Sequence, residues 1–133
     1  MIDCHCHFLP NIDDGPTNLD ESLMLARMAV VNGIELSVMT PHIHPGRYHN
    51  QKKNIEQAVD DFKQELERND LPLELRTAAE VRIGPEILTM VKQESIPFLG
   101  ELEGYQVMLL EFPHDMIPVG SENLVDWLLK RKI

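Results

Sequence analysis

The feature of this sequence that most constrains its fold is a repeated alternation between short apolar segments and longer amphipathic ones. Residues 2–7, 34–40, 73–81 and 105–112 have the alternation or the apolar composition of β-strands. Each is followed by apolar residues at helical spacing, which predicts helices after Thr17, over 50–69, from Pro85 and from Ser121. The order βαβαβαβα predicts an α/β fold with a parallel sheet, because parallel strands need crossover connections.

Local signals set the expected ends and faces of these elements. Thr17 with Asp20 resembles a capping box, Gly33 is a stop signal, Pro85 suits a helix start, and Ser121 suits an N-cap. The largely apolar run 105–112 predicts a strand that is buried on both faces. The expected buried helix faces are Leu19, Leu23, Ala26 and Val30; Ile55, Val59, Phe62 and Leu66; Ile87, Leu88 and Val91; and Leu124, Val125, Leu128 and Leu129.

Length and charge limit the classes of function. A chain of 133 residues suffices for one domain but is short for a closed α/β barrel. The net charge of -10 and the absence of a Lys/Arg cluster argue against nucleic acid or an anionic membrane as a partner. No basic segment followed by an apolar run opens the chain, and no apolar stretch approaches the ~20 residues of a membrane span. We therefore expect a cytoplasmic protein.

The first predicted strand carries two histidines on one face. Side chains alternate along a strand, so His5 and His7 point to the same side, about 7 Å apart at their Cα atoms. This spacing suits two nitrogen ligands of one divalent metal. Cys4 and Cys6 share the opposite face and are too close for an easy disulfide, so we expect small buried residues that pack behind the strand. A mixed Cys/His zinc site would need residues on opposite faces to converge, which strand geometry opposes.

Residues able to bind a metal occur at or near the end of each predicted strand. Because parallel strands place their carboxyl ends on one rim, these residues should converge there. His, Asp and Glu make up 28 of the 133 residues, so one of them could lie at one strand end by chance. Chance is a weaker explanation for such residues at four successive strand ends. The candidate ligands are His5, His7, His42, Glu80 and Glu111, with Asp14 in the loop after the first strand. They exceed what one tetrahedral zinc needs, and they predict two or more ions of zinc, manganese or iron. Such a cluster polarises phosphoryl oxygens and generates hydroxide at neutral pH.

The loop after the second predicted strand and the end of the third leave alternatives open. Arg47 could bind a phosphate through its planar guanidinium group or could be a solvated loop residue. His44 repeats the His-x-His spacing with His42, but its Pro-Gly loop disfavours ligation. His49 and His114 are expected on the surface. Arg82 could contact substrate or could pair with a carboxylate.

The motifs around these residues resemble those of a known family. MIDCHCHFLPNIDDGP, TPH at His42 with GRYHN after it, AAEVRI at Glu80 and LLEFP at Glu111 resemble the PHP (polymerase and histidinol phosphatase) superfamily. More narrowly, they resemble the bacterial metal-dependent protein-tyrosine phosphatases of capsule and exopolysaccharide operons. The resemblance covers essentially the whole chain, and IDDGP, EVRI and LLEFP separate this branch from histidinol phosphatases.

The resemblance implies a three-metal site at the mouth of a distorted (βα)7 TIM-like barrel that hydrolyses phosphotyrosine on a partner tyrosine kinase. The catalytic residues that it implies are Arg47, which would meet the phosphate, and His42. Hydroxide generated at the metal centre would attack phosphorus in line, with charge on the equatorial oxygens stabilised by the ions and Arg47. The implied ligands are His5 and His7 for one ion, Glu80 as a bridge, Glu111 for a second ion, and Asp14 with His42 for a third.

The sequence departs from the family pattern after residue 111. Family members continue with a His-Pro-Glu-Arg strand and later an Asp-x-His strand, and neither motif occurs in residues 1–133. We therefore expect a partial PHP domain consisting of the first four βα units, apparently truncated, with weak or no activity. Two alternatives stay open. One is a non-catalytic metal-binding or interaction module, whose exposed first and fourth strands pair with a second copy or a partner chain. The other is a PHP phosphoesterase acting on a small phosphate ester.

Overall fold

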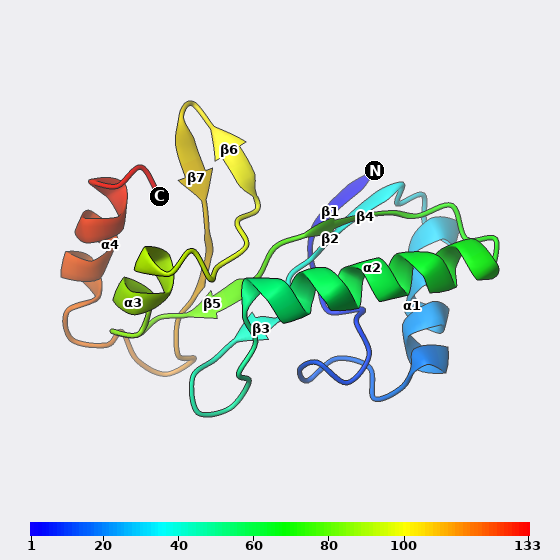
Figure 1. Ribbon diagram of the computed structural model, residues 1–133, viewed down its shortest axis with the longest axis horizontal. Helices are drawn as coiled ribbons and strands as arrows, with labels where there is room; N and C mark the ends of the chain where they lie inside the picture. Colours follow the sequence, from blue (N-terminus) through cyan, green and yellow to red (C-terminus); the bar gives the residue numbers. More distant parts are fainter.

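Parallel strands form the centre of the structure, a computed structural model that describes residues 1–133. One sheet has the order β1 (Ile2–Cys6), β2 (Leu36–Met39), β4 (Glu74–Thr77), and a second has the order β3 (His42–Ile43), β5 (Glu80–Arg82), β8 (Leu109–Glu111). All pairings within these two sheets are parallel. The predicted α/β class with parallel strands is therefore confirmed (Figure 1).

The second and third predicted strands are each interrupted, which creates the two sheets. Residues 40–41 separate β2 from β3, and residues 78–79 separate β4 from β5. His42, expected just after a strand, therefore opens β3 and pairs with Glu80 in the register. The backbone stays hydrogen-bonded across the interruptions, through Thr40 N to Cys6 O (3.0 Å), Ala78 N to Met39 O (2.9 Å) and Glu80 N to Pro41 O (3.2 Å). The four predicted strands thus lie side by side in chain order.

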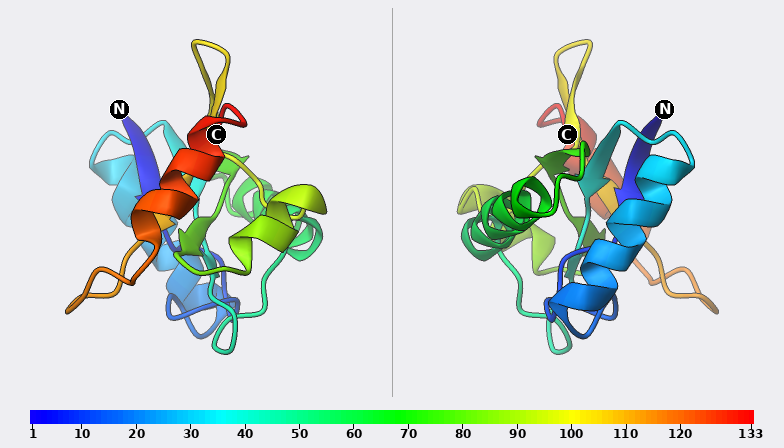
Figure 2. Two further views of the ribbon diagram at one scale, coloured as in Figure 1. Left: turned by 90° about the vertical axis from the view of Figure 1, so that its left-hand side faces the viewer. Right: turned by 90° about the vertical axis from the view of Figure 1, so that its right-hand side faces the viewer.

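Four helices surround these strands (Figure 2). They are α1 (Leu19–Val31), α2 (Lys52–Arg68), the short α3 (Ile87–Lys92) and α4 (Ser121–Leu129). The predicted face of α2 is confirmed, since Ile55, Val59, Phe62 and Leu66 are all buried. On α4 the predicted face is buried only at Leu128, and Leu129 is exposed. The buried side chains of strands and helices form one continuous core. None of the helices has the length and apolar composition needed to cross a membrane.

Two helix caps differ from the sequence prediction. Asn18, not Thr17, is the N-cap of α1, because its side chain accepts a hydrogen bond from Glu21 N at 3.0 Å. Thr17 instead donates to the Glu21 carboxylate through its backbone N and its hydroxyl. Ser121 does not cap α4 but lies in its first turn and donates to Pro118 O at 2.6 Å. Capping by one of several adjacent polar residues depends on the local backbone angles, which the sequence pattern does not give.

A hairpin that the sequence analysis missed precedes β8. It consists of β6 (Gly100–Leu102) and antiparallel β7 (Tyr105–Val107), and it projects from the rest of the molecule (Figures 1 and 2). Glu103 and Gly104 both have positive φ (53° and 82°), as a two-residue hairpin turn requires. The predicted strand 105–112 therefore splits, and only its second part, β8, pairs with β5. The expected burial on both faces is wrong, because β7 is mostly exposed and β8 is a half-buried edge strand.

The two cysteines lie in different surroundings. Cys6 is buried, and burial followed by the nearby Asp3 charge raises the pKa of its thiol to about 12. Cys4 is exposed, so the expectation that both cysteines pack behind the strand is wrong for Cys4. The reason is that β1 is an edge strand whose pairing with β2 shifts register between Asp3 and Cys6.

Candidate metal centre

The structure brings His5 and His7 of the first strand segment together with Glu80 of β5. The two Nε2 atoms lie 3.2 Å apart. Glu80 Oε2 lies 3.0 Å from His5 Nε2 and 3.2 Å from His7 Nε2. Although 75 residues separate His5 from Glu80 in the chain, and β1 and β5 belong to different sheets, the fold brings the two side chains into contact. Three atoms with lone pairs therefore face one small volume.

His42 extends this group toward two further carboxylates. Its Nδ1 lies 3.6 Å from Glu80 Oε2 and 3.5 Å from Glu111 Oε2, and its Nε2 lies 3.4 Å from Asp14 Oδ1. All six expected ligands thus fall into three overlapping groups, within each of which the ligand atoms lie within 4.8 Å of one another. The groups are His5, His7 and Glu80; His7, Asp14 and His42; and His42, Glu80 and Glu111.

Two buried atoms in this cluster lack a hydrogen-bond partner. His42 Nδ1 and Glu111 Oε2 face each other at 3.5 Å, too far apart for a good hydrogen bond, and neither is otherwise satisfied. A buried polar atom without a partner costs free energy, and a divalent cation between the two would remove that cost. Imidazole nitrogens and carboxylate oxygens are also the donors that zinc, manganese and iron accept. The residues present therefore fit a group of divalent metal ions.

Asp13 is a site residue that the sequence analysis did not select. Its side chain is fully buried, whereas that of the neighbouring Asp14 is 49% exposed. Asp13 Oδ2 accepts from His7 Nδ1 at 2.7 Å and from His42 N at 3.0 Å, and Oδ1 accepts from Gly15 N at 3.0 Å. The available signal was the Asp-x-Gly spacing, which is typical of a turn closed by an aspartate side chain.

Asp13 and His7 also shift each other's pKa. The hydrogen bond that His7 donates to Asp13 raises the pKa of His7 despite the opposing effect of burial. Burial disfavours the Asp13 carboxylate, but hydrogen bonds from His7, Gly15 and His42 outweigh it and lower the pKa of Asp13. The pair is therefore held with the negative charge on Asp13.

Asn50 is a second buried residue that supports the site. Its amide nitrogen donates to Ile12 O at 2.9 Å and to His42 O at 2.8 Å. Its oxygen accepts from the Asn54 side chain at 2.9 Å. Asn50 therefore fastens the loop after β1 to β3, where His42 lies. Asn50 is the last residue of the GRYHN motif, but the sequence alone assigned it no role.

The loop from His44 to Tyr48 covers one side of His42. The Tyr48 ring stacks on the His42 ring at 5.7 Å, and the exposed Arg47 guanidinium lies 5.0 Å from the Tyr48 ring centroid. A tight turn with Gly46 at φ +84° closes the loop, and His44 N donates to Tyr48 O at 2.9 Å. Arg47 makes no ion pair, so its guanidinium is available beside the cluster.

The other candidates from the sequence are Arg82 and three further histidines. Arg82 Nη1 binds Glu111 Oε1 at 2.7 Å, which favours the carboxylate-pairing alternative for Arg82. His44 belongs to none of the three ligand groups, and partial burial, followed by the Arg82 charge, lowers its pKa. His49 and His114 are exposed, as predicted.

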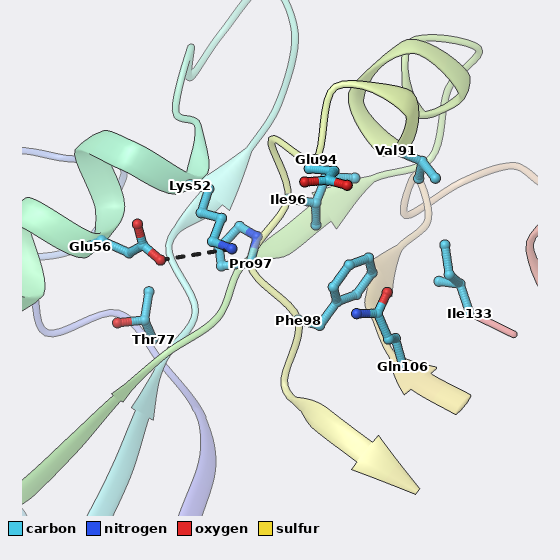
Figure 3. Close-up of a pocket in the computed structure, with 10 residues that line it drawn as sticks. All are labelled: Lys52, Glu56, Thr77, Val91, Glu94, Ile96, Pro97, Phe98, Gln106 and Ile133. Atoms are coloured by element: carbon cyan, nitrogen blue, oxygen red, sulfur yellow. Dashed lines mark ion pairs between the residues drawn. The ribbon is translucent and has the colours of Figure 1, made fainter. Parts of the chain in front are cut away.

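A pocket of about 550 Å³ lies away from this cluster and contains none of the predicted site residues (Figure 3). It includes Lys52 and Glu56 of α2, which form an ion pair at 4.0 Å, with Phe98 before the hairpin and Gln106 of β7. Its lining offers no group of metal-binding side chains. The chemically distinctive part of the molecule is the histidine and carboxylate cluster.

Known proteins match this chain in both sequence and structure. YwqE of Bacillus subtilis, a tyrosine-protein phosphatase, is 35% identical over 124 residues, which cover 93% of this chain and 48% of YwqE. CpsB of Streptococcus agalactiae, also a tyrosine-protein phosphatase, is 30% identical over 112 residues, or 84% of this chain and 45% of CpsB. The chain thus spans about half the length of these curated relatives.

A solved structure shares the fold. It comes from the crystal structures of YwqE from Bacillus subtilis and CpsB from Streptococcus pneumoniae, described as unique metal-dependent tyrosine phosphatases. It matches with a TM-score of 0.86 and 35% identity, over 100% of this chain and 53% of its own. The sequence model described as capsular polysaccharide synthesis, CpsB/CapC, spans residues 1–119. On this match, the chain belongs to the CpsB/CapC family of capsular polysaccharide synthesis proteins.

Proposed function

We propose that the histidine and carboxylate cluster binds up to three divalent ions and forms part of the active site of a metal-dependent protein-tyrosine phosphatase. The observation that carries this proposal is the overlap of three ligand groups, built from residues far apart in the chain. The relatives named as tyrosine-protein phosphatases support the choice of reaction.

The arrangement suggests a role for each ligand. His5 and His7 would hold one ion, Glu111 would serve a second, and Asp14 with His42 would serve a third. Glu80 belongs to two of the three groups, as expected of a bridging carboxylate. Bound manganese, iron or zinc would polarise the phosphoryl oxygens and supply hydroxide at neutral pH.

The protein's own cationic side chains divide into two roles. Arg47 is unpaired and exposed, so we propose that it binds the phosphate oxygens through its planar guanidinium group, held at the site by its contact with Tyr48. We propose that His42, on which the Tyr48 ring stacks, is a catalytic residue together with Arg47. Arg82 is engaged with Glu111 and would fix the direction of that carboxylate.

We further propose that residues 1–133 form four βα units of a PHP domain with a (βα)7 TIM-like barrel. The strand order and the parallel pairing support this arrangement. The substrate would be a phosphorylated tyrosine kinase of the polysaccharide-export system, in the cytoplasm. The link to capsular polysaccharide synthesis in the family description and the phosphatase names of the relatives support the choice of a phosphotyrosine substrate in that system.

Metal counting by native mass spectrometry and a substrate panel test this proposal. We expect manganese to bind, and any hydrolysis to favour a phosphotyrosine peptide over histidinol phosphate. Arg47→Ala should lower hydrolysis without changing the metal count, whereas Arg76→Ala, which removes an exposed arginine of β4, should change neither. A wild-type protein that binds no divalent metal contradicts the proposal. The low activity expected for residues 1–133 alone stays a prediction.

One observation favours the interaction-module alternative. β1 and β8 each pair on one side only, so both present an unpaired edge. Such edges suit a second copy or a partner chain. Sedimentation at increasing concentration distinguishes the two readings: a monomer at all concentrations argues against self-pairing through these edges.

A further inference from the structure

Asp13 makes contacts that a residue merely filling space would not make. Its side chain is fully buried, and its two oxygens accept three hydrogen bonds, from one imidazole and two backbone N–H groups. The donors are His7, directly after β1, Gly15 in the following turn, and His42 of β3. Asp13 therefore joins His7 and His42, two proposed metal ligands from different parts of the chain.

The hydrogen bonds determine where the proton of His7 lies. An ionised carboxylate can only accept, and Asp13 Oδ2 already accepts from His42 N. His7 Nδ1, 2.7 Å from the same oxygen, must therefore carry a proton. In the neutral imidazole this leaves the lone pair on Nε2, the atom that lies 3.2 Å from Glu80 Oε2.

The turn that carries Asp13 is built against His7. A Cβ atom at Gly15 would lie 2.5 Å from the His7 carbonyl oxygen, so this position accepts only glycine without movement. The Gly15 N–H points back to Asp13 Oδ1 at 3.0 Å. The backbone N–H groups of Gly15 and His42 thus hold the two oxygens of the Asp13 carboxylate in position.

We propose that Asp13 is a positioning residue that fixes His7 in its Nδ1–H tautomer and anchors the backbone of His42, so that both imidazoles are set for metal before it arrives. This inference rests on the proposed metal binding and adds a residue that itself offers no ligand atom to the three groups. Carboxylates that accept from a ligating histidine typically change metal affinity 10–100-fold when removed.

The test compares Asp13→Ala with Ser121→Ala. Ser121 is the matched control because it is buried, its side chain hydrogen-bonds a backbone group (Pro118 O, 2.6 Å), and it belongs to none of the three ligand groups. The first measurement is the imidazole ¹H–¹⁵N spectrum of the metal-free ¹⁵N-labelled protein, at a pH where His7 is neutral. We expect His7 as Nδ1–H in the wild type and in Ser121→Ala, and a shift toward Nε2–H in Asp13→Ala.

The second measurement is Mn²⁺ affinity by calorimetry. Asp13→Ala should bind roughly 10–100-fold more weakly than wild type, and Ser121→Ala within about threefold of it. If Asp13→Ala does not fold, Asp13→Asn replaces it. Its single acceptor oxygen cannot serve all three donors, so it should still bind more weakly than Ser121→Ala.

The outcomes separate this inference from the proposed function. A His7 that remains Nδ1–H in Asp13→Ala, with unchanged Mn²⁺ affinity, overturns the positioning role and leaves the metal centre intact. A wild type that binds no Mn²⁺ overturns the metal centre, while the tautomer spectra still decide whether Asp13 sets His7.

Discussion

Substituting Glu80 by Gln should remove much of the thermal stabilisation that a divalent metal gives this protein. Glu80 Oε2 lies 3.0, 3.2 and 3.6 Å from nitrogens of His5, His7 and His42, so it is the most shared atom of the cluster. An amide keeps the shape of the side chain but loses its charge. Every group that contains Glu80 should therefore bind metal less tightly.

The size of the effect follows from mass action. A metal at 100 times its dissociation constant stabilises the fold by about 2.7 kcal/mol. With an unfolding entropy of about 2.1 cal/mol/K per residue, a chain of 133 residues should melt roughly 10 °C higher. If Glu80→Gln weakens binding about tenfold, the gain at the same metal concentration falls to about 1.4 kcal/mol, or roughly 5 °C.

Differential scanning calorimetry with and without Mn²⁺ measures these shifts, each variant being compared with its own metal-free form. Glu74→Gln is the matched control, because Glu74 is an exposed carboxylate of β4 outside the cluster. It should keep the wild-type shift. An equal shift in Glu80→Gln and wild type would refute the assignment of Glu80 as a shared ligand.

Three further predictions concern the scaffold. Phe62→Ala, at a 2% exposed position of α2, should cost about 3–5 kcal/mol in chemical denaturation, and a loss below about 1 kcal/mol would contradict the described core. Gly15→Ala should cost about 1–3 kcal/mol and weaken Mn²⁺ binding, because its Cβ would meet the His7 carbonyl; unchanged stability and binding would show that the turn yields easily. The Thr17 backbone N–H, and then the Thr17 hydroxyl, donate hydrogen bonds that lower the pKa of Glu21 from 4.5. The contribution of Glu21 to folding stability is therefore complete above pH 4.5 and is lost as the pH falls through the lower pKa of the folded state. Glu21→Gln should therefore reduce the fall in melting temperature between about pH 6 and about pH 3, and an unchanged fall would rule out this contribution.

Strand order alone predicts which residues of the candidate site lie close together. His5, His7, His42, Glu80 and Glu111 could be grouped from the sequence because parallel strands end on one rim, and the structure does bring them together. Their role as metal ligands stays a prediction. Asp13 and Asn50 could not be selected in this way, because their importance lies in burial and in hydrogen bonds to backbone groups far away in the chain.

The errors in the fold have a common origin. The run 105–112 looks like one buried strand, but Gly104 allows a hairpin that takes its first residues into antiparallel pairing. β8 is then an edge strand, so its apolar residues are only half-buried. Cys4 is exposed for a related reason, since it lies on the other edge strand, where the register shifts. Edge positions depend on which strands are neighbours, which periodicity does not report.

The sequence by itself determined the alternation of strands and helices, the buried face of α2 and the family. Those properties follow from local periodicity and from short motifs, which are present before the chain folds. Tertiary structure decided which of two adjacent aspartates is buried between two histidines, where the strands break, and which edges remain unpaired. These features arise from contacts between residues distant in the chain, and burial and hydrogen bonding at such contacts exist only once the strands lie side by side.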